Sequence, residues 1–270
     1  MSNLTPQEKA ERTYNYTADF FDDPALGFWD RAGRRMVEML DLQQGMQVLD
    51  VCCGTGASAL PAAEAVGSAG KVVGIDLAEG LLELARKKAV VRRLDHVDFV
   101  KGDMTALSFE EQSWDAVIIV FGIFFVPDME NQVQKLWRLV RPGGKLGVAT
   151  WGPRFWEPAY TEWKSVLTKV APGLVSEFNP WDRITSAEAV HRLIDLEGSR
   201  VGVYAEETVQ PLRGPEDFWR VAMGSGLRWP IEQLGPEKAM IFKNQLVGRL
   251  TSLTGIETNV IYGIADKIQV

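Results

Sequence analysis

Residues 48–57 of this sequence read Val-Leu-Asp-Val-Cys-Cys-Gly-Thr-Gly-Ala, an apolar run followed by two closely spaced glycines. The apolar run predicts a buried strand, and the segment after it predicts a helix that begins near Ser58. Gly54 and Gly56 let the backbone turn sharply and approach a ligand closely, while free N–H groups at the start of a helix attract an anion. The stretch is therefore typical of a nucleotide-binding loop between a strand and a helix.

One interpretation of the loop is a dinucleotide site. The pattern Gly54-x-Gly56-x-x-Ala59 satisfies the relaxed dinucleotide fingerprint, and Asp76 follows Gly56 by 76 − 56 = 20 residues. Taken alone this match leaves a nicotinamide-dependent oxidoreductase open as the function.

Three further features favour a different ligand. Asp50 stands at the strand end just ahead of the glycines, Gly102-Asp103-Met104 ends a third apolar run, and Arg-Pro-Gly-Gly at 141–144 precedes a fifth. With these features the chain resembles the class I S-adenosylmethionine-dependent methyltransferases, most closely the small-molecule branch of the ubiquinone and menaquinone type. The resemblance covers about residues 10–150. One departure is Cys52, where the family usually has a glycine, so a slightly different turn is expected there.

Composition excludes several other classes. The chain has 270 residues, of which 46% are hydrophobic and 24% are charged, as expected for one large globular domain. A net charge of −7 argues against a nucleic-acid surface. No apolar run reaches the roughly 20 residues of a membrane span. We expect a cytoplasmic protein, because its cysteines, at 52 and 53, supply no disulfide framework and no secretory leader opens the chain.

The adjacent cysteines do not predict a metal site. Neighbouring residues on a strand point to opposite faces, so they cannot chelate as a Cys-x-x-Cys pair does. We expect no metal and interpret Cys52 and Cys53 as small buried residues.

The order of the predicted elements indicates the fold class. Val-, Ile- and Leu-rich runs predict strands at 47–51, 71–76, 97–101, 114–120 and 144–150, with helices at 58–67, 78–93 and 129–139. Alternating strands and helices indicate a parallel sheet with ligands at the carboxyl ends of its strands. One or two helices are predicted over 7–42, with the break at Asp22-Asp23-Pro24 and Pro24 in the first turn of the second.

After Trp151 the pattern changes. It predicts helices at 157–171 and 186–197, a strand at 200–208, a helical block over 215–253 and a last strand at 258–268. We therefore expect an α/β fold, a Rossmann-like doubly wound sheet of seven strands that is mostly parallel with the last strand antiparallel. Helical insertions follow strand 5 and separate strands 6 and 7.

We expect a single domain over 1–270. Its parts would be an N-terminal helical cap at 1–45, a cofactor-binding core at 46–151, and insertions at 152–185 and 210–254 that shape the acceptor pocket.

The resemblance implies S-adenosylmethionine as the cofactor and S-adenosylhomocysteine as the product. Asp76 would accept both ribose hydroxyl protons, or alternatively cap the next helix. Asp103 would accept from the adenine amino group, or form a turn with Thr105. The Met104 N–H would meet a ring nitrogen, and Asp50 would orient the glycine loop and the donor's ammonium end. The remaining candidates for contact with the cofactor are the backbone of Cys52, the loop glycines Gly54 and Gly56, and the apolar side chains of Leu77, Leu81 and Phe121.

The N-terminal segment is rich in aromatic residues, which could form a lid over the donor with a ring face toward the sulfonium. We favour Tyr16 by analogy with related enzymes. At helical spacing such residues also serve plain packing. The group comprises Tyr14, Tyr16, Phe20, Phe21, Phe28 and Trp29.

The part of the chain after residue 150 holds six of the nine tryptophans, which favours an apolar or aromatic acceptor pocket. Segments 180–183 and 224–229 each place an arginine beside a tryptophan, an arrangement suited to binding an acidic acceptor or to a surface salt bridge. The tryptophans are Trp151, Trp156, Trp163, Trp181, Trp219 and Trp229.

No residue stands out as a general base. His191, Asp182, Glu157 and Arg228 are the weak catalytic candidates. The sequence predicts transfer of a methyl group from S-adenosylmethionine to a small, hydrophobic or aromatic acceptor. The alternatives are the nicotinamide-dependent oxidoreductase and a protein that binds S-adenosylmethionine without turnover. The kind of acceptor atom and the oligomeric state stay open.

Overall fold

A computed structural model describes residues 4–176 and 178–269 of the chain. The first part alternates strands and helices as expected. The strands are β1 (Gln47–Val51), β2 (Lys71–Asp76), β3 (Val97–Lys101), β4 (Trp114–Val120) and β5 (Val140–Trp151), and β6 (Ser199–Glu206) and β9 (Val260–Lys267) follow later. β5 begins earlier than predicted, because the Arg-Pro-Gly-Gly stretch already belongs to it.

Within the described residues these strands form one seven-stranded sheet in the order β3-β2-β1-β4-β5-β9-β6. Neighbours among β1 to β5 are parallel, whereas β9 runs antiparallel to both β5 and β6. The predicted fold class is confirmed. The strand order reverses between β1 and β4, and ligands of such sheets bind at the carboxyl ends of the strands beside that point.

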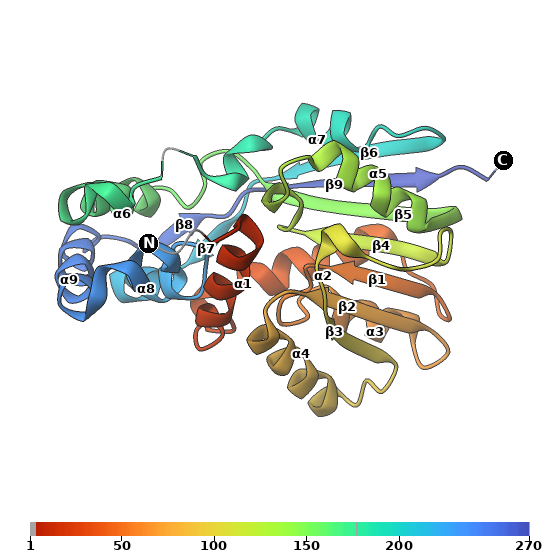
Figure 1. The fold of residues 1–270 in the computed structure, drawn as a ribbon, viewed down its shortest axis with the longest axis horizontal. Coiled ribbons are helices and arrows are strands. Elements are labelled where there is room, and N and C mark those ends of the chain that lie inside the picture. The colour runs from red at the N-terminus through yellow and green to blue at the C-terminus, as the bar shows by residue number, and fades with distance from the viewer. Residues whose placement is uncertain (1–3, 177, 270) are drawn as a thin grey trace.

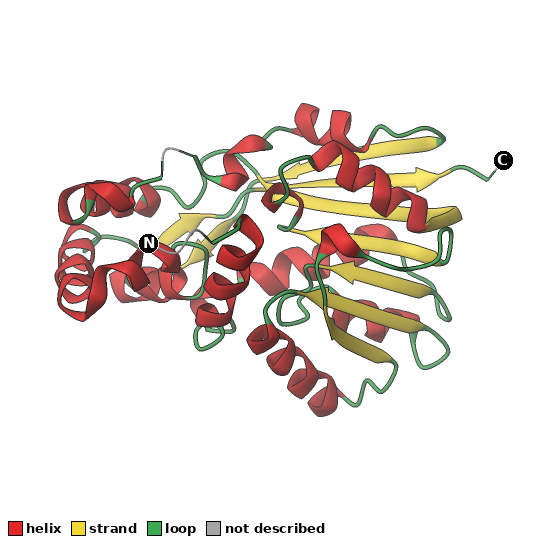
Figure 2. Ribbon diagram, viewed as in Figure 1, coloured by secondary structure: helices red, strands yellow, loops and turns green. Residues whose placement is uncertain are grey.

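Helices cover both faces of the sheet (Figure 2). Gly147 on β5 faces α2 (Phe28–Leu40), whose Met36 Sδ lies 2.5 Å from where a Cβ would be. Gly263 on β9 stands opposite Val148, one position further along β5, and faces α7 (Ala187–Ile194). Because successive residues of a strand point to opposite faces, α2 and α7 lie on opposite sides. The helices α3 (Ala59–Val66), α4 (Glu79–Arg92) and α5 (Met129–Leu139) complete the layers.

The second half of the chain places several helices at one end of the molecule, beyond the ends of the parallel strands (Figure 1). These are α6 (Ala159–Val170), α8 (Pro215–Met223) and α9 (Arg228–Arg249). The predicted block 215–253 is thus two helices, and α9 is itself kinked at Gly235, where φ is +73° ahead of Pro236.

The predicted last strand at 258–268 is confirmed as β9. A short strand, β8 (Gly255–Glu257), pairs with β7 (Val209–Pro211) in a small separate sheet, and β9 follows it. Two such short strands carry little local pattern, so the sequence does not predict them.

The N-terminal region differs from the prediction at Pro24. The first helix is α1 (Pro6–Thr17), and Pro24 opens a short 3-10 turn over Pro24–Leu26 instead of the first turn of α2. The Asp23 side chain accepts from the Ala25 N–H at 2.9 Å and holds that turn.

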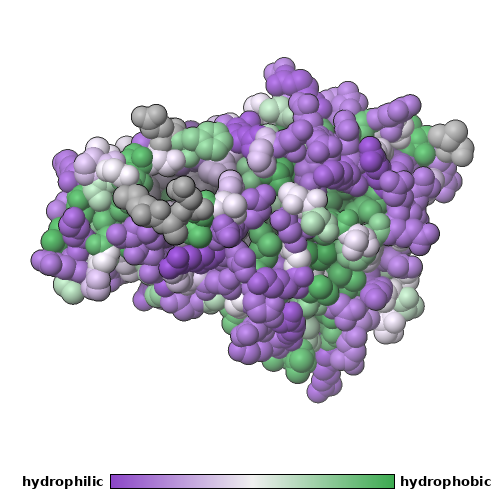
Figure 3. Space-filling view, viewed as in Figure 1, coloured by the Kyte–Doolittle hydropathy of each residue, from purple (hydrophilic) through white to green (hydrophobic). Residues whose placement is uncertain are grey.

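The face of the molecule in Figure 3 is mainly hydrophilic, with smaller apolar areas among the hydrophilic ones. Val100, on the edge strand β3, is one of the exposed apolar residues. Among the described residues, no helix combines the length and the apolar character that crossing a membrane requires.

Candidate functional site

A cavity lies at the carboxyl ends of β1, β2 and β4. Its empty space is about 1120 Å³, including the part open to solvent. The glycine loop, α1, the turn after β4, and the segments 151–156 and 225–227 contribute to its lining. The cavity therefore joins the predicted cofactor loop to the tryptophan-rich second half of the chain.

Cys52 begins the turn of the glycine loop with φ of +60°, a left-handed conformation that favours glycine. This conformation explains why a glycine is expected there. Cys52 lines the cavity, its Sγ lies 4.0 Å from Met104 Sδ, and burial raises the pKa of its thiol well above the usual value. It acts as a small apolar wall residue.

Gly54 and Gly56 do not play equivalent parts. Both have positive φ, but a Cβ at Gly54 would meet the ring of Phe21, which lines the cavity, at 3.5 Å. A Cβ at Gly56 would meet Leu60 at 3.0 Å and Phe99 at 3.2 Å, both in the core. Gly54 lines the cavity, whereas Gly56 is placed against the core side of the loop.

Asp76 holds the loop in place at the end of β2. Its Oδ2 accepts from the Gly54 N–H and its Oδ1 from the Ala78 N–H, each at 2.9 Å. Burial raises the pKa of this carboxyl, and these backbone donors oppose the rise. Asp76 lines the cavity next to Leu77 and Leu81. It does not cap α4 with its side chain, because the N-cap residue is Ala78 and, at the start of this helix, Asp76 accepts only from that residue's own N–H.

Asp50 lies beneath the loop and is fully buried. Its Oδ2 accepts from the Ser58 hydroxyl at 2.7 Å, while Oδ1 has no partner. Burial raises the pKa of Asp50 to about 7, although the Ser58 hydroxyl and the backbone N–H of Ala59 oppose the rise. Asp50 is not part of the cavity lining, but Ser58 is. An unpaired buried oxygen beside a ligand cavity is one that a bound group or a water would satisfy.

Because its pKa is raised, the contribution of Asp50 to the free energy of unfolding depends on pH. The folded-state pKa of about 7 lies above the usual 3.8, so the contribution is fully present below about pH 4 and is lost as the pH rises through about 7. Asp50→Asn cannot titrate. Between about pH 5 and about pH 8 the wild type should lose roughly 3 kcal/mol of unfolding free energy relative to this variant. Urea denaturation at both pH values measures it, and a difference that does not change with pH would contradict the assignment.

Asp103 is placed differently from Met104. Its Oδ1 accepts from both the N–H and the hydroxyl of Thr105 at 2.8 Å, which is the turn interaction considered above. Met104 and Gly102 line the cavity on either side of it, and Asp103 does not. Phe121 lines the cavity with φ of +56° and stacks on Trp151.

Tyr16 lies outside the cavity lining and Tyr14 lies in it, which corrects the expected lid residue. Residues two apart on a helix point about 200° apart, so one of the two faces away. The Tyr16 hydroxyl accepts from Arg12 Nε at 2.7 Å. Tyr14 packs edge-on against Phe21 and Phe125, and burial, with Asp76 and Cys52 nearby, raises its pKa.

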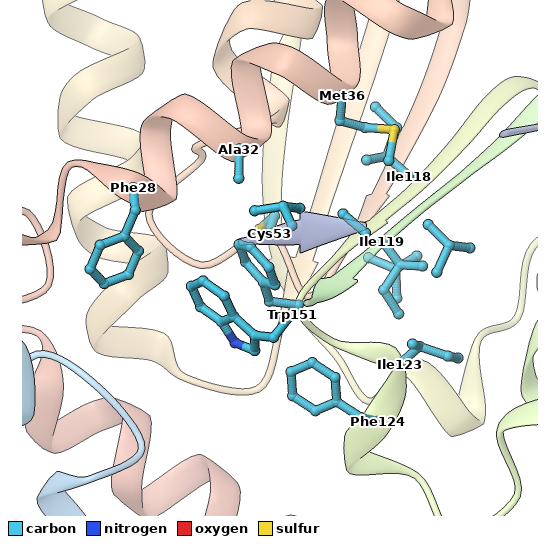
Figure 4. Packing of buried hydrophobic residues seen from close by; sticks show 14 of the residues in the cluster. Phe28, Ala32, Met36, Cys53, Ile118, Ile119, Ile123, Phe124 and Trp151 are labelled. Atoms are coloured by element: carbon cyan, nitrogen blue, oxygen red, sulfur yellow. The ribbon is translucent and has the colours of Figure 1, made fainter. Parts of the chain in front are cut away.

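Aromatic rings form much of the cavity wall. Trp151 stacks on Phe121 with ring centroids 3.9 Å apart, and Phe155 stacks on Trp156 at 4.2 Å. Figure 4 shows the rings of Phe28 and Phe124 on two sides of Trp151. Of the six tryptophans singled out in the sequence, Trp151, Trp156 and Trp181 line the cavity.

The other three tryptophans lie elsewhere. Trp163 packs between Tyr160 and Phe242, and Trp219 packs near Phe242 under the Lys243 ammonium. Trp229 lies beneath the ammonium of Lys9. These positions indicate packing between the insertion helices and at the N-terminal cap.

Arg228 is not available as an anchor for an acidic acceptor. It is 8% exposed, its guanidinium pairs with Asp19, and its Nε donates to Glu232 at 2.7 Å. These carboxylates neutralise it, so it ties α9 to the segment after α1. Arg183 is likewise engaged, because it donates to the carbonyls of Val126 and Pro127.

The remaining catalytic candidates lie outside the cavity lining. Asp182 accepts from the Asn179 amide at 2.9 Å, and Glu157 accepts from the Thr161 hydroxyl at 2.7 Å. His191 is exposed on α7, which packs against β6 and β9. The structure does not bring these side chains together with Asp76.

Sequence reasoning missed Phe124, Phe125 and Phe155 as lining residues. The available signal was the aromatic cluster Phe121-Gly-Ile-Phe-Phe directly after a predicted strand, at the edge where ligands bind. Phe155 adjoins Trp156, one of the six tryptophans from which the sequence predicted an aromatic pocket.

Comparisons with known proteins agree with this geometry. Residues 25–176 match the model of the ubiE/COQ5 methyltransferase family. The demethylmenaquinone methyltransferase of Oceanobacillus iheyensis is 39% identical over 110 residues, which cover 41% of this chain and 46% of that protein. The enzyme of that name from Anoxybacillus flavithermus is 33% identical over 144 residues, or 52% of this chain and 61% of that one. The chain therefore spans about half the length of the curated relatives it matches.

Solved structures share the fold. The [4+2]-cyclase SpnF superposes with a TM-score of 0.64 at 20% identity, covering 99% of this chain and 98% of that one. The YcgJ protein from Bacillus subtilis gives a TM-score of 0.59 at 16% identity, covering 89% and 99%. One of these two proteins is named a cyclase, so the shared fold by itself does not identify the chemistry. The family match is more informative about the chemistry, because it spans over half of the chain and includes the glycine loop, Asp76 and the aromatic turn after β4. This protein belongs to the ubiE/COQ5 methyltransferase family.

Proposed function

We propose that this protein transfers a methyl group from S-adenosylmethionine to a small, quinol-like aromatic acceptor. The observation that carries the proposal is a cavity that joins the Asp76 carboxylate and the glycine loop to a wall of aromatic rings. The curated relatives are named for methylation of demethylmenaquinone, a quinone with an aromatic ring. Membership of a methyltransferase family argues against the nicotinamide-dependent alternative.

The residues present fit the donor. Gly54 keeps this part of the cavity free of a side chain. Asp76 presents a carboxylate that can accept hydrogen bonds from the ribose hydroxyls while it keeps those from the Gly54 and Ala78 N–H groups. Asp50 lies behind the lining residue Ser58, and its unpaired Oδ1 would accept from the donor's ammonium end through a water. Leu77, Leu81 and Met104 supply apolar contact. When bound, S-adenosylmethionine supplies an electrophilic methyl group on a sulfonium.

The side chains then act by binding, orientation and exclusion of water. Methyl transfer is an in-line displacement, so its rate depends on holding the acceptor atom roughly 3–3.5 Å from the methyl carbon. Tyr14, Phe21 and Trp29 line the cavity and would help to exclude water from it when the donor is bound. Apart from Asp76 and Glu11, no carboxylate lines the cavity in the described residues, so the acceptor must bring its own ionisable hydroxyl.

Calorimetric titration and a turnover assay test the proposal. We expect micromolar binding of S-adenosylmethionine and S-adenosylhomocysteine, none of NADH or NADPH, and methylated product from a reduced naphthoquinone that lacks a ring methyl. Binding of NADH or NADPH would overturn the assignment. Binding of S-adenosylmethionine without product from any acceptor of a phenol and quinol panel would favour a non-catalytic binding protein instead.

A further inference from the structure

We infer that the acceptor end of the cavity is a tryptophan-walled subsite for an uncharged flat ring, and that the indole N–H of Trp156 donates to an oxygen of that ring. The inference rests on the proposed function and names how the acceptor is recognised.

The walls of this end are near-parallel rings. Trp156 and Phe155 stack with centroids 4.2 Å apart and planes at 22°, and Phe155 and Trp181 stack at 5.0 Å and 29°. Trp151 and Phe121 form a second stack at 3.9 Å and 11°. Faces of this kind bind flat aromatic bodies by offset stacking.

The charges of the lining decide against an anionic acceptor. Among the described residues, no lysine, arginine or histidine lines the cavity. Its acidic residues are Asp76 and Glu11, and Glu11 is already bound by Lys101 at 2.6 Å. With S-adenosylhomocysteine bound, which has no sulfonium, a carboxylate placed here would lose its hydration without a counter-charge, which is strongly unfavourable.

Trp156 supplies the polar contact. It is 1% exposed, and its Nε1 has no hydrogen-bond partner. An indole N–H can only donate, so the missing partner is an acceptor atom, such as a hydroxyl or carbonyl oxygen, and not an ammonium group. The indole nitrogens of Trp29 and Trp181, which also line the cavity, lack partners as well.

The backbone holds Trp156 in an unusual conformation. Its φ is +53°, a left-handed value that is rare for a bulky side chain, and its N–H donates to the Glu257 carbonyl at 3.0 Å. Such strain persists where the surrounding structure over-determines it and is concentrated at ligand sites. Cys52 and Phe121, also in the lining, share this conformation.

Trp156 Nε1 is buried in this structure, so an acceptor oxygen reaches it only when neighbouring side chains move. The half-buried ring of Phe155 is one of these neighbours, and it is stacked on the face of the indole.

Three probes with the same ring test the subsite: 1-naphthol, naphthalene without oxygen, and anionic 1-naphthoate. Equilibrium dialysis with saturating S-adenosylhomocysteine gives their affinities for the full chain. The wild type should bind 1-naphthol about tenfold more tightly than the other two. Trp156→Phe should weaken 1-naphthol binding about tenfold and change naphthalene binding less than about twofold.

Trp163→Phe is the matched control. Trp163 is buried with an unpartnered indole nitrogen, but it lies outside the lining, so both affinities should stay unchanged. Equal losses of 1-naphthol and naphthalene in Trp156→Phe, or no loss of either, would overturn the hydrogen bond. Naphthoate binding as tight as 1-naphthol would overturn the charge selection. Failure of S-adenosylhomocysteine to bind the wild type would count against the proposed function instead.

Discussion

Asp76→Asn is expected to weaken S-adenosylhomocysteine binding about 100-fold. The carboxylate accepts from Gly54 and Ala78 through different oxygens, so one of these N–H groups must face the new amide donor. The variant also loses the charge that would bind the ribose hydroxyls. Hydrogen bonds to charged groups contribute about 1.5–3 kcal/mol each, and about 3 kcal/mol in total corresponds to the expected factor. Isothermal titration measures the affinity.

Asp98→Asn is the control for Asp76→Asn. Asp98 lies on the neighbouring strand β3, where its side chain is 63% exposed and 3.5 Å from Lys71 Nζ. Asp98→Asn removes the same charge at a position away from the cavity, so the affinity for S-adenosylhomocysteine should stay within about twofold of the wild-type value. An Asp76→Asn protein that is folded and binds as tightly as the wild type would remove Asp76 from the cofactor site.

Gly33→Ala is expected to lower the unfolding free energy by roughly 3 kcal/mol or more and to weaken cofactor binding with it. Gly33 lies on α2, and a Cβ there would fall 2.4 Å from the Ala57 carbonyl oxygen and 2.7 Å from the Ser58 nitrogen. Both atoms belong to the backbone just after the glycine loop, so they cannot move aside as a flexible side chain could. The helix or the loop must shift. Thermal unfolding should show a fall in Tm of about 6–12 °C.

Gly248→Ala provides the matched comparison. Gly248 also lies in a helix, α9, but a Cβ there meets nothing within 4 Å. Alanine has the higher helix propensity, so this variant should be stabilised by up to about 1 kcal/mol. Equal effects of the two substitutions would mean that the close approach of α2 to the loop is not what requires glycine at position 33.

Much of the sheet could be predicted because its information is local. Strands buried on both faces appear as short continuous apolar runs, and β1 shows this clearly, with Val48, Leu49 and Val51 fully buried. The short strands β7 and β8 could not be predicted. Three residues carry no period, and their pairing joins positions far apart in the chain.

The part of the cavity around the glycine loop was predictable, and the aromatic part much less so. Asp76 is the last residue of β2 and Gly54 lies in the loop just after β1, so their placement at the sheet edge depends on local order alone. The choice between Tyr14 and Tyr16 depends on which side of α1 meets the sheet, and an amphipathic pattern with aromatics on both sides does not reveal it.

The sequence by itself determined the strand order along the chain, the glycine loop and the family to which the protein belongs. Only the tertiary structure decided which charged and aromatic side chains reach the cavity. Arg228 is neutralised by Asp19, 209 residues earlier in the chain, and Trp156 is brought against Phe28 from α2. The physical reason is that periodicity and turn chemistry act between near neighbours, whereas the environment of a side chain is set by packing between distant segments.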